Sequence, residues 1–282
     1  MSLFNTVALH PFTECNMNCP FCYKKKSSDS LPQSFFVKLM KELKGMTTQV
    51  ACGGGEPFLK PEFIMEMAHQ CRRNNIYFNV TTNGKPLLEI APKDFKDLFR
   101  DITMVSISFD RYKVKTAIDV VKYLTLVNAI KKYAGIEVGC NLLVDEQMFL
   151  YNSFLRLVSH LFKHGVDRVF ALYPKNIKGF DIRKYVEYYG AASLMFPKFY
   201  VDDLTRKLLE EGYKWKTPCH YGNRFISINE HGAVTGCSFD DESKAVIVLK
   251  EPKDILKMKK LQFEKRYNCP YLNLKGVIHG KT

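Results

Sequence analysis

The sequence predicts an α/β fold in which short parallel strands alternate with helices. Short apolar stretches alternate with amphipathic stretches over roughly the first two thirds of the chain. Glycine or polar residues directly follow several of the apolar stretches, where a strand would end. Such alternation is typical of βα units that build a parallel sheet. No internal repeat, low-complexity tract or linker interrupts the pattern, so we expect six consecutive βα units.

Each expected strand is a short apolar segment, and each expected helix has apolar residues at helical spacing. The six strands are expected at residues 7–10, 48–52, 76–81, 104–109, 136–144 and 169–173. The helices are expected at residues 34–43, 62–74, 92–100, 114–133 and 151–163. A cysteine-containing loop follows the first strand and a glycine run follows the second, so we expect function at the carboxyl ends of the strands.

Length and composition limit the class of protein. A chain of 282 residues, 46% of them apolar, is long enough for one barrel-sized domain and a small appendage. No apolar run approaches the roughly 18 residues of a membrane span, and residues 1–5 lack the pattern of a signal peptide. We therefore expect a cytoplasmic protein without a membrane partner. Nine cysteines in such a chain indicate metal or redox chemistry rather than disulfides.

The net charge of +13 favours an anionic partner. A phosphorylated substrate, an acidic peptide, nucleic acid and an acidic electron donor would all fit, and a merely lysine-rich surface is the alternative. Nucleic acid is not favoured, because no separate RNA-binding appendage is visible in the sequence.

Three cysteines after the first strand, Cys15, Cys19 and Cys22, have the spacing C-x3-C-x2-C. They offer three thiolates, whereas a closed structural zinc site needs four ligands. A 4Fe–4S cluster held by three cysteines keeps one iron open to a small molecule. A zinc knuckle with a distant fourth ligand is the alternative.

Together with Phe21 before the third cysteine and the run Gly53-Gly54-Gly55-Glu56-Pro57, this pattern resembles the radical S-adenosylmethionine (SAM) superfamily. The resemblance implies a partial (β/α)6 TIM-type barrel over residues 1–200. It implies a 4Fe–4S cluster on the three cysteines, with SAM bound at the open iron. It further implies a flavodoxin- or ferredoxin-like electron donor and a 5′-deoxyadenosyl radical that removes a hydrogen atom from the substrate.

The resemblance also implies a set of residues around SAM. They are Phe21, Gly54, Gly55, Glu56, Ser108, Asp110, Asn141 and Leu172. The two glycines would let backbone approach the methionine moiety closely, and Glu56 would accept from its amino group. Ser108 and Asp110 could instead cap a strand end, and Leu172 could be an ordinary core residue. Cys52, Cys71 and Cys140 are expected to be small buried apolar residues.

A second set of cysteines lies in the last 80 or so residues. Cys219 is followed by twelve residues, Gly232, four residues and Cys237. Two strands at 224–229 and 233–238 would form a β-hairpin, since Gly232 suits its turn. A helix at 252–266 would precede Cys269. This order resembles the SPASM or twitch extension, which implies a domain at 201–282 that holds a second, auxiliary 4Fe–4S cluster on Cys219, Cys237 and Cys269.

One position departs from the SPASM pattern, because Leu272 stands where a further cysteine is usual. The auxiliary cluster could then have an open iron that binds substrate. It could instead be closed by a ligand other than cysteine, from the set His220, Asp240, Asp241 and His279. A third reading is a zinc site of the three cysteines and one histidine.

The function expected from these patterns is a radical SAM oxidoreductase or cyclase acting on a small anionic substrate. The alternative is a peptide-modifying radical SAM maturase. Such enzymes often carry a peptide-recognition domain before the first strand, where only six residues precede Val7, but that domain can be a separate protein. An alternative from another class is a non-catalytic metal-binding interaction protein with zinc at the C-terminal cysteines. It would leave the glycine run and the six βα units unexplained.

Overall fold

The computed structural model describes residues 2–143, 153–172, 183–212, 216–267 and 269. Its strands are β1 Phe4–Leu9, β2 Thr47–Cys52, β3 Tyr77–Thr82, β4 Met104–Phe109, β5 Glu137–Leu143, β6 Arg168–Leu172, β7 Phe199–Val201, β8 Phe225–Ile228, β9 Ala233–Thr235 and β10 Ile247–Val248. Its α-helices are α1 Gln33–Glu42, α2 Pro61–Arg73, α3 Phe95–Leu98, α4 Ala117–Ala134, α5 Ser153–Lys163, α6 Arg183–Met195 and α7 Asp203–Glu211. Short 3-10 helices are η1 Pro57–Leu59, η2 Pro86–Glu89, η3 Pro92–Asp94, η5 Glu242–Lys244 and η6 Pro252–Lys259.

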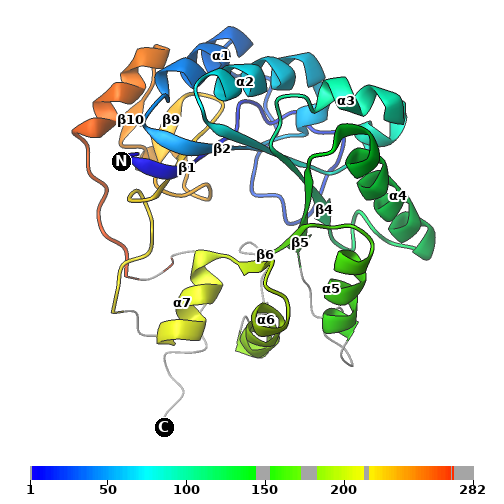
Figure 1. Cartoon of the computed structure of the whole chain (residues 1–282). Coiled ribbons are helices and arrows are strands. Elements are labelled where there is room, and N and C mark those ends of the chain that lie inside the picture. The colour runs from blue at the N-terminus through cyan, green and yellow to red at the C-terminus, as the bar shows by residue number, and fades with distance from the viewer. Residues whose placement is uncertain (1, 144–152, 173–182, 213–215, 268, 270–282) are drawn as a thin grey trace.

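The strands form one ten-stranded open sheet in the order β10-β9-β8-β1-β2-β3-β4-β5-β6-β7. Strands β1 to β7 are parallel to their neighbours, as is β8 to β1, whereas β9 and β10 pair antiparallel. Figure 1 shows a curved sheet with the helices on its outer side. The expected α/β partial-barrel fold is therefore confirmed.

The two faces of the parallel strands differ in chemistry, because successive side chains of a strand point to opposite faces. One valine from each of the first five strands is at most 1% exposed and belongs to the core beneath the helices: Val7, Val50, Val80, Val105 and Val138. The opposite face carries small or polar side chains that line a cavity: Ala8, Ala51, Thr81, Ser108 and Asn141. The helices thus cover an apolar outer face of the sheet, and its inner face presents small or polar side chains to the cavity.

The six expected parallel strands are present, each within three residues at the ends that the structure describes. Residues 144, 151 and 173, where three expected elements begin or end, lie outside the described residues. A seventh parallel strand, β7, was not predicted, because three residues give too short a periodic signal.

Two expected helices are shorter than predicted. The segment 92–100 is a 3-10 turn, η3, followed by the single turn of α3, since Ile102 already bonds back to Phe99 and leads into β4. The segment 252–266 is helical only over η6. Its buried residues Ile255 and Met258 are three apart, which suits a 3-10 helix. Beyond η6 the chain extends, and Phe263 packs on Tyr221 instead.

The expected C-terminal hairpin is present as β8 and β9, with Gly232 at φ +79° in the turn. It continues the barrel sheet, because Ile226 of β8 pairs with Val7 of β1. The division of the chain at residue 200 stays a prediction. Among the described residues, no helix combines the length and the apolar character needed to cross a membrane.

Candidate active site

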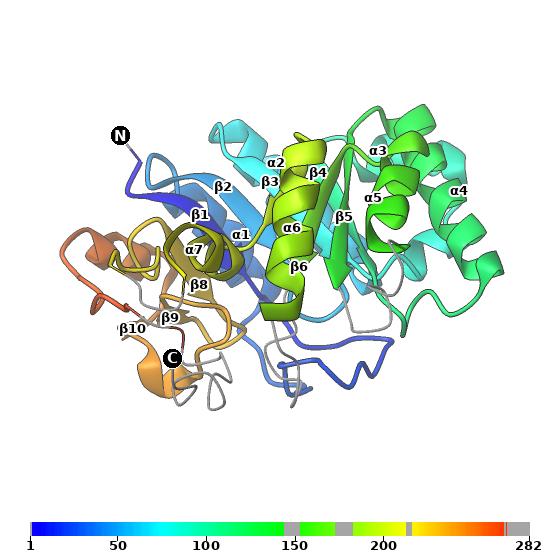
Figure 2. The same ribbon diagram turned by 90° about the horizontal axis from the view of Figure 1, so that it is seen from below.

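A cavity of about 640 Å³ lies at the carboxyl ends of the parallel strands. This volume falls within the ~300–1,000 Å³ of typical small-molecule sites. In Figure 2 the loop after β1 and the C-terminal segments lie on the same side of the sheet. Every residue expected to bind a cluster or SAM lines this one cavity: Cys15, Cys19, Phe21, Cys22, Gly54, Gly55, Glu56, Ser108, Asp110, Asn141, Leu172, Cys219, Cys237 and Cys269.

The glycine run after β2 holds the cysteine loop in place. The backbone N–H groups of Gly55 and Glu56 donate to the carbonyls of Phe12 and Glu14, at 2.9 and 2.8 Å. A Cβ atom on Gly55 would lie 1.8 Å from the Glu14 carbonyl oxygen, and one on Gly54 would lie 2.6 Å from that of Phe12. The absent side chains therefore let the backbone of the cysteine loop approach β2. Contact between the backbone of Gly54 and Gly55 and the methionine moiety of SAM stays a prediction.

Glu56 joins the ends of β2 and β3. Its side chain accepts hydrogen bonds from the Thr82 hydroxyl at 2.6 Å, from Asn83 N at 2.7 Å and from Phe58 N at 3.1 Å. The residue is 1% exposed, and burial raises the pKa of its carboxyl while these donors oppose the rise. Both carboxyl oxygens thus already stabilise the fold at the edge of the cavity.

The three N-terminal cysteines lie on the loop after β1 and line the cavity. Cys15 and Cys19 are half-buried and Cys22 is exposed. Cys15 Sγ accepts from Met17 N at 3.4 Å and lies 3.9 Å from Asn83 Nδ2. Burial raises the pKa of Cys19, an effect that the nearby Lys113 opposes.

No group of three or more Cys, His, Asp or Glu side chains in the described part of the chain converges on a single metal ion. A 4Fe–4S cluster does not need ligands that converge on one ion, because each cysteine binds a separate iron. Three thiols around one cavity wall fit that donor set.

Asp110 and Lys113 form a buried ion pair beside the thiols. Their side chains are 3% and 10% exposed, and Asp110 Oδ1 also accepts from Tyr112 N and Lys113 N. The Lys113 ammonium lies 5.1 Å from the ring centroid of Phe21. Lys113 therefore connects the end of β4 to the cysteine loop.

The inner face of the barrel supplies the remaining expected contacts. Asn141 Nδ2 donates to Thr81 Oγ1 at 3.1 Å, so Asn141 is oriented within the cavity. Leu172, at the end of β6, is 36% exposed and is a wall residue of the cavity rather than part of the core. Cys52, Cys71 and Cys140 are at most 2% exposed, as expected, and burial raises the pKa of Cys140 to about 12.

A network around Arg266 supports the C-terminal cysteines. Its guanidinium donates to both carboxylate oxygens of Asp240, at 3.0 and 3.2 Å, and to the Tyr221 hydroxyl at 2.7 Å. It also lies 3.5 Å from the Tyr221 ring centroid. Backbone bonds connect the network to the thiols, since Cys219 N donates to Arg266 O and Asp240 N donates to Cys237 O.

The structure separates the residues considered as a fourth ligand. Asp240 is engaged by Arg266, whereas Asp241 caps η5 through Ser243 N and is not a wall residue of the cavity. His220 lines the cavity, with its Nδ1 at 3.4 Å from Arg206 Nη2. His279 and Leu272 lie outside the described residues.

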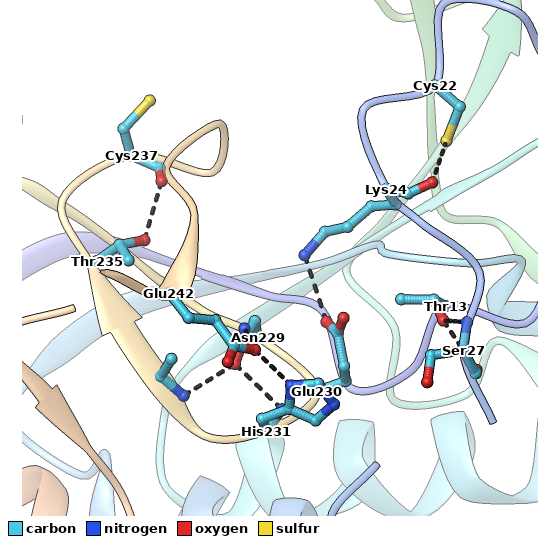
Figure 3. Close-up of polar contacts among 11 residues, drawn as sticks. Thr13, Cys22, Lys24, Ser27, Asn229, Glu230, His231, Thr235, Cys237 and Glu242 are labelled. Carbon is cyan, nitrogen blue, oxygen red and sulfur yellow. Dashed lines mark hydrogen bonds and ion pairs between the residues drawn. The ribbon is translucent and has the colours of Figure 1, made fainter. Parts of the chain in front are cut away.

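The two cysteine-bearing segments are in direct contact. The rings of Tyr23 and Phe239, which follow Cys22 and Cys237, are 4.5 Å apart between centroids. Figure 3 shows Lys24 extending from the Cys22 loop toward Glu230 at the turn of the β8–β9 hairpin, at 3.3 Å. Both cysteine sets therefore belong to one preformed site.

Sequence reasoning missed several cavity residues, among them His10, Lys113 and Arg266. The positions of His10 at the end of an expected strand and of Lys113 three residues after Asp110 were usable signals. Arg266 had no such signal, because it reaches the site only through tertiary packing.

Residues 9–146 match the radical SAM superfamily, so the chain carries a radical SAM domain. A relative described as the uncharacterized protein MJ0804 of Methanocaldococcus jannaschii is 32% identical over 113 residues, which cover 38% of this chain and 37% of that protein. The chain thus matches little more than a third of the length of this curated relative.

Solved structures share the fold. SuiB of Streptococcus suis bound to S-adenosylmethionine has a TM-score of 0.64 at 16% identity, covering 84% of this chain and 61% of SuiB. SuiB bound to its precursor peptide SuiA has a TM-score of 0.61 at 15% identity, covering 90% and 67%. The structure of anSMEcpe with AdoMet and the Cp18Cys peptide has a TM-score of 0.64 at 16% identity, covering 92% and 80%. At such identities the similarity shows the fold alone.

Proposed function

We propose that the radical SAM domain at residues 9–146 binds a 4Fe–4S cluster on Cys15, Cys19 and Cys22 and cleaves SAM in the cavity. The single observation that carries this proposal is that all fourteen expected site residues line one cavity. When bound and reduced, the cluster with SAM supplies a 5′-deoxyadenosyl radical that removes a hydrogen atom from a substrate.

The chain's own residues orient and enclose this chemistry. Glu56 keeps the ends of β2 and β3 together, and the glycine run fixes the cysteine loop against β2. The Asp110–Lys113 ion pair lies beside Cys19, where Lys113 opposes and Asp110 adds to the rise that burial causes in the pKa of that thiol. Such a preformed wall limits the reorganisation needed when cofactor and substrate bind.

We further propose an auxiliary 4Fe–4S cluster on Cys219, Cys237 and Cys269. Support comes from the Arg266 network, which connects to two of these residues through backbone bonds and needs no metal to form. A cluster there could accept an electron from the substrate radical, which would make the reaction an oxidation or a bond-forming cyclisation.

Iron, acid-labile sulfide and zinc, measured on the anaerobically reconstituted chain, test the two-cluster proposal. About eight irons per chain are expected for two clusters. About four irons with one zinc would overturn the auxiliary cluster and leave a structural C-terminal zinc site.

Two substrate classes fit the cavity. A peptide is favoured because, among the described residues, the two cations that line the cavity are each paired with a carboxylate, Lys113 with Asp110 and Arg266 with Asp240. Lys24, near His10 of the cavity wall, is likewise paired with Glu230. Two structures of the same fold hold peptides: SuiB with its precursor peptide SuiA, and anSMEcpe with the Cp18Cys peptide. A small anionic substrate is the second candidate, since the chain has a net charge of +13.

The two classes can be separated by thermal shift of the reconstituted, SAM-loaded protein. A random peptide pool is expected to raise the midpoint, and a panel of nucleotides and sugar phosphates is not. The reverse pattern would favour the anionic substrate.

We also propose a flavodoxin- or ferredoxin-like electron donor. This proposal predicts that a reduced flavodoxin can replace dithionite as the reductant in SAM cleavage.

A further inference from the structure

His10 occupies an unusual place in the cavity. It directly follows β1 and shares the inner face of the sheet with Ala8, two residues earlier. The residue is 7% exposed and lines the cavity. It is therefore a buried imidazole at the floor of the site.

Neither ring nitrogen of His10 has a hydrogen-bond partner among the residues that the structure describes. Buried polar atoms are nearly always paired, so an unpaired imidazole calls for a partner from outside the fold. Burial, together with the nearby charge of Lys24, lowers the pKa of His10 to about 3. The ring is thus neutral near pH 7, with one nitrogen donating and the other accepting.

The surroundings of His10 are balanced in charge. Lys24 is paired with Glu230, with side chains 14% and 10% exposed, and Figure 3 shows this pair between the Cys22 loop and the hairpin. The ring of Tyr23 lies edge-on, 6.4 Å away. The third neighbour is Gly53, on which a Cβ atom would lie 3.7 Å from His10 Nδ1, an ordinary van der Waals distance, and this nitrogen is itself buried.

We propose that His10 binds an uncharged polar group of the substrate, one that both donates and accepts a hydrogen bond. A peptide amide and a hydroxyl share this chemistry. The proposal rests on the proposed function, because the ligand is the substrate of the same cavity. A carboxylate or phosphate would suit the subsite poorly, since the imidazole stays neutral and Lys24 already has a carboxylate partner.

Nitrogen-15 NMR of the full chain, labelled at its seven histidines, tests the proposal directly. The His10 signal is assigned by its absence in the His10→Gln variant. We expect a neutral imidazole whose nitrogen shifts move on titration with N-methylacetamide or glycerol but not with sodium acetate or inorganic phosphate. A response to N-methylacetamide alone would indicate a peptide amide, and a response to glycerol alone a hydroxyl-bearing substrate.

A response to acetate or phosphate, or to none of the four probes, would overturn the proposal. The titration needs neither cluster nor SAM. Loss of SAM cleavage in the reconstituted wild type, with the amide response intact, would instead overturn the proposed function.

A pair of variants distinguishes substrate binding from a structural role of His10. Since its nitrogens have no partner in the described fold, His10→Phe is expected to keep the thermal midpoint and to lose the response to N-methylacetamide, read from the backbone amide signal of Gly53. If His10→Phe lowers the thermal midpoint and His10→Gln keeps the wild-type midpoint, a buried water holds the ring. That result would overturn the proposal.

Discussion

The carboxylate of Glu56 accepts the Thr82 hydroxyl proton in a hydrogen bond of 2.6 Å, which joins the carboxyl ends of β2 and β3. The same side chain accepts from Asn83 N, and the Asn83 side chain donates to Asn16 Oδ1 at 2.8 Å. One buried acid thus connects the sheet to the cysteine loop.

Replacing Glu56 with Gln should destabilise the protein by about 1–3 kcal/mol, because an amide N–H₂ would face a buried donor. Urea unfolding of the chain without clusters measures the loss. Glu66→Gln, an exposed change on α2, is the matched control and should cost less than about 0.5 kcal/mol. Equal midpoints for the two variants would contradict the role given to Glu56.

Substitutions at two glycines of the same run distinguish an effect of backbone packing from a general effect of added volume. Gly55→Ala places a Cβ 1.8 Å from the Glu14 carbonyl oxygen, so we expect displacement of the cysteine loop and a loss of at least ~1–3 kcal/mol. In Gly53→Ala the new Cβ would have its nearest contact at 3.7 Å, an ordinary distance. Iron retention after reconstitution should fall in Gly55→Ala, and an equal fall in Gly53→Ala would contradict the account.

The Asp240–Arg266 pair is expected to control the C-terminal cysteine site. Asp240→Asn keeps the shape but leaves the partly buried guanidinium of Arg266 without its anionic partner, which should cost about 3 kcal/mol or more. The iron content should fall by about half if a second cluster is present. Asp241→Asn, one residue away and outside the cavity wall, should leave the iron content unchanged.

The hairpin turn should respond to pH through His231. A hydrogen bond to Glu242 raises the pKa of His231, so the protonated form is favoured in the folded state. The stabilisation is fully present below the unfolded pKa of about 6.5 and is lost as the pH rises through the higher folded pKa. The two side chains are 40% and 50% exposed, which limits the effect to about 0.2–1 kcal/mol.

Urea unfolding at about pH 6 and about pH 9 measures this loss against His231→Gln, because His titrates between these values. The variant is expected to show a smaller difference between the two pH values. An unchanged difference would assign the pH dependence to other groups.

Much of the fold could be predicted because each parallel strand carries a strong local signal. Strand β4 was predicted with its exact bounds from an apolar stretch that ends at Asp110. Strand β7 gave no comparable signal over its three residues. The end of η6 depends on Phe263 packing against Tyr221, a contact between segments far apart in sequence.

The candidate site was predictable where its residues stand at fixed spacing, as the cysteines and the glycine run do. The partners of these residues were not. Three donors of the protein bind the carboxylate of Glu56, which the sequence did not predict, while its contact with SAM stays a prediction. Arg266 and His10 acquire their roles from burial and from neighbours that only the folded chain brings close.

The central claim is SAM cleavage on the cluster of Cys15, Cys19 and Cys22. It is tested most directly by the formation of 5′-deoxyadenosine from SAM, with the anaerobically reconstituted, dithionite-reduced chain compared with its Cys19→Ala variant. We expect 5′-deoxyadenosine from the wild type and none above background from Cys19→Ala. Equal amounts from both proteins, or none from a wild type that holds its iron, would contradict the central claim.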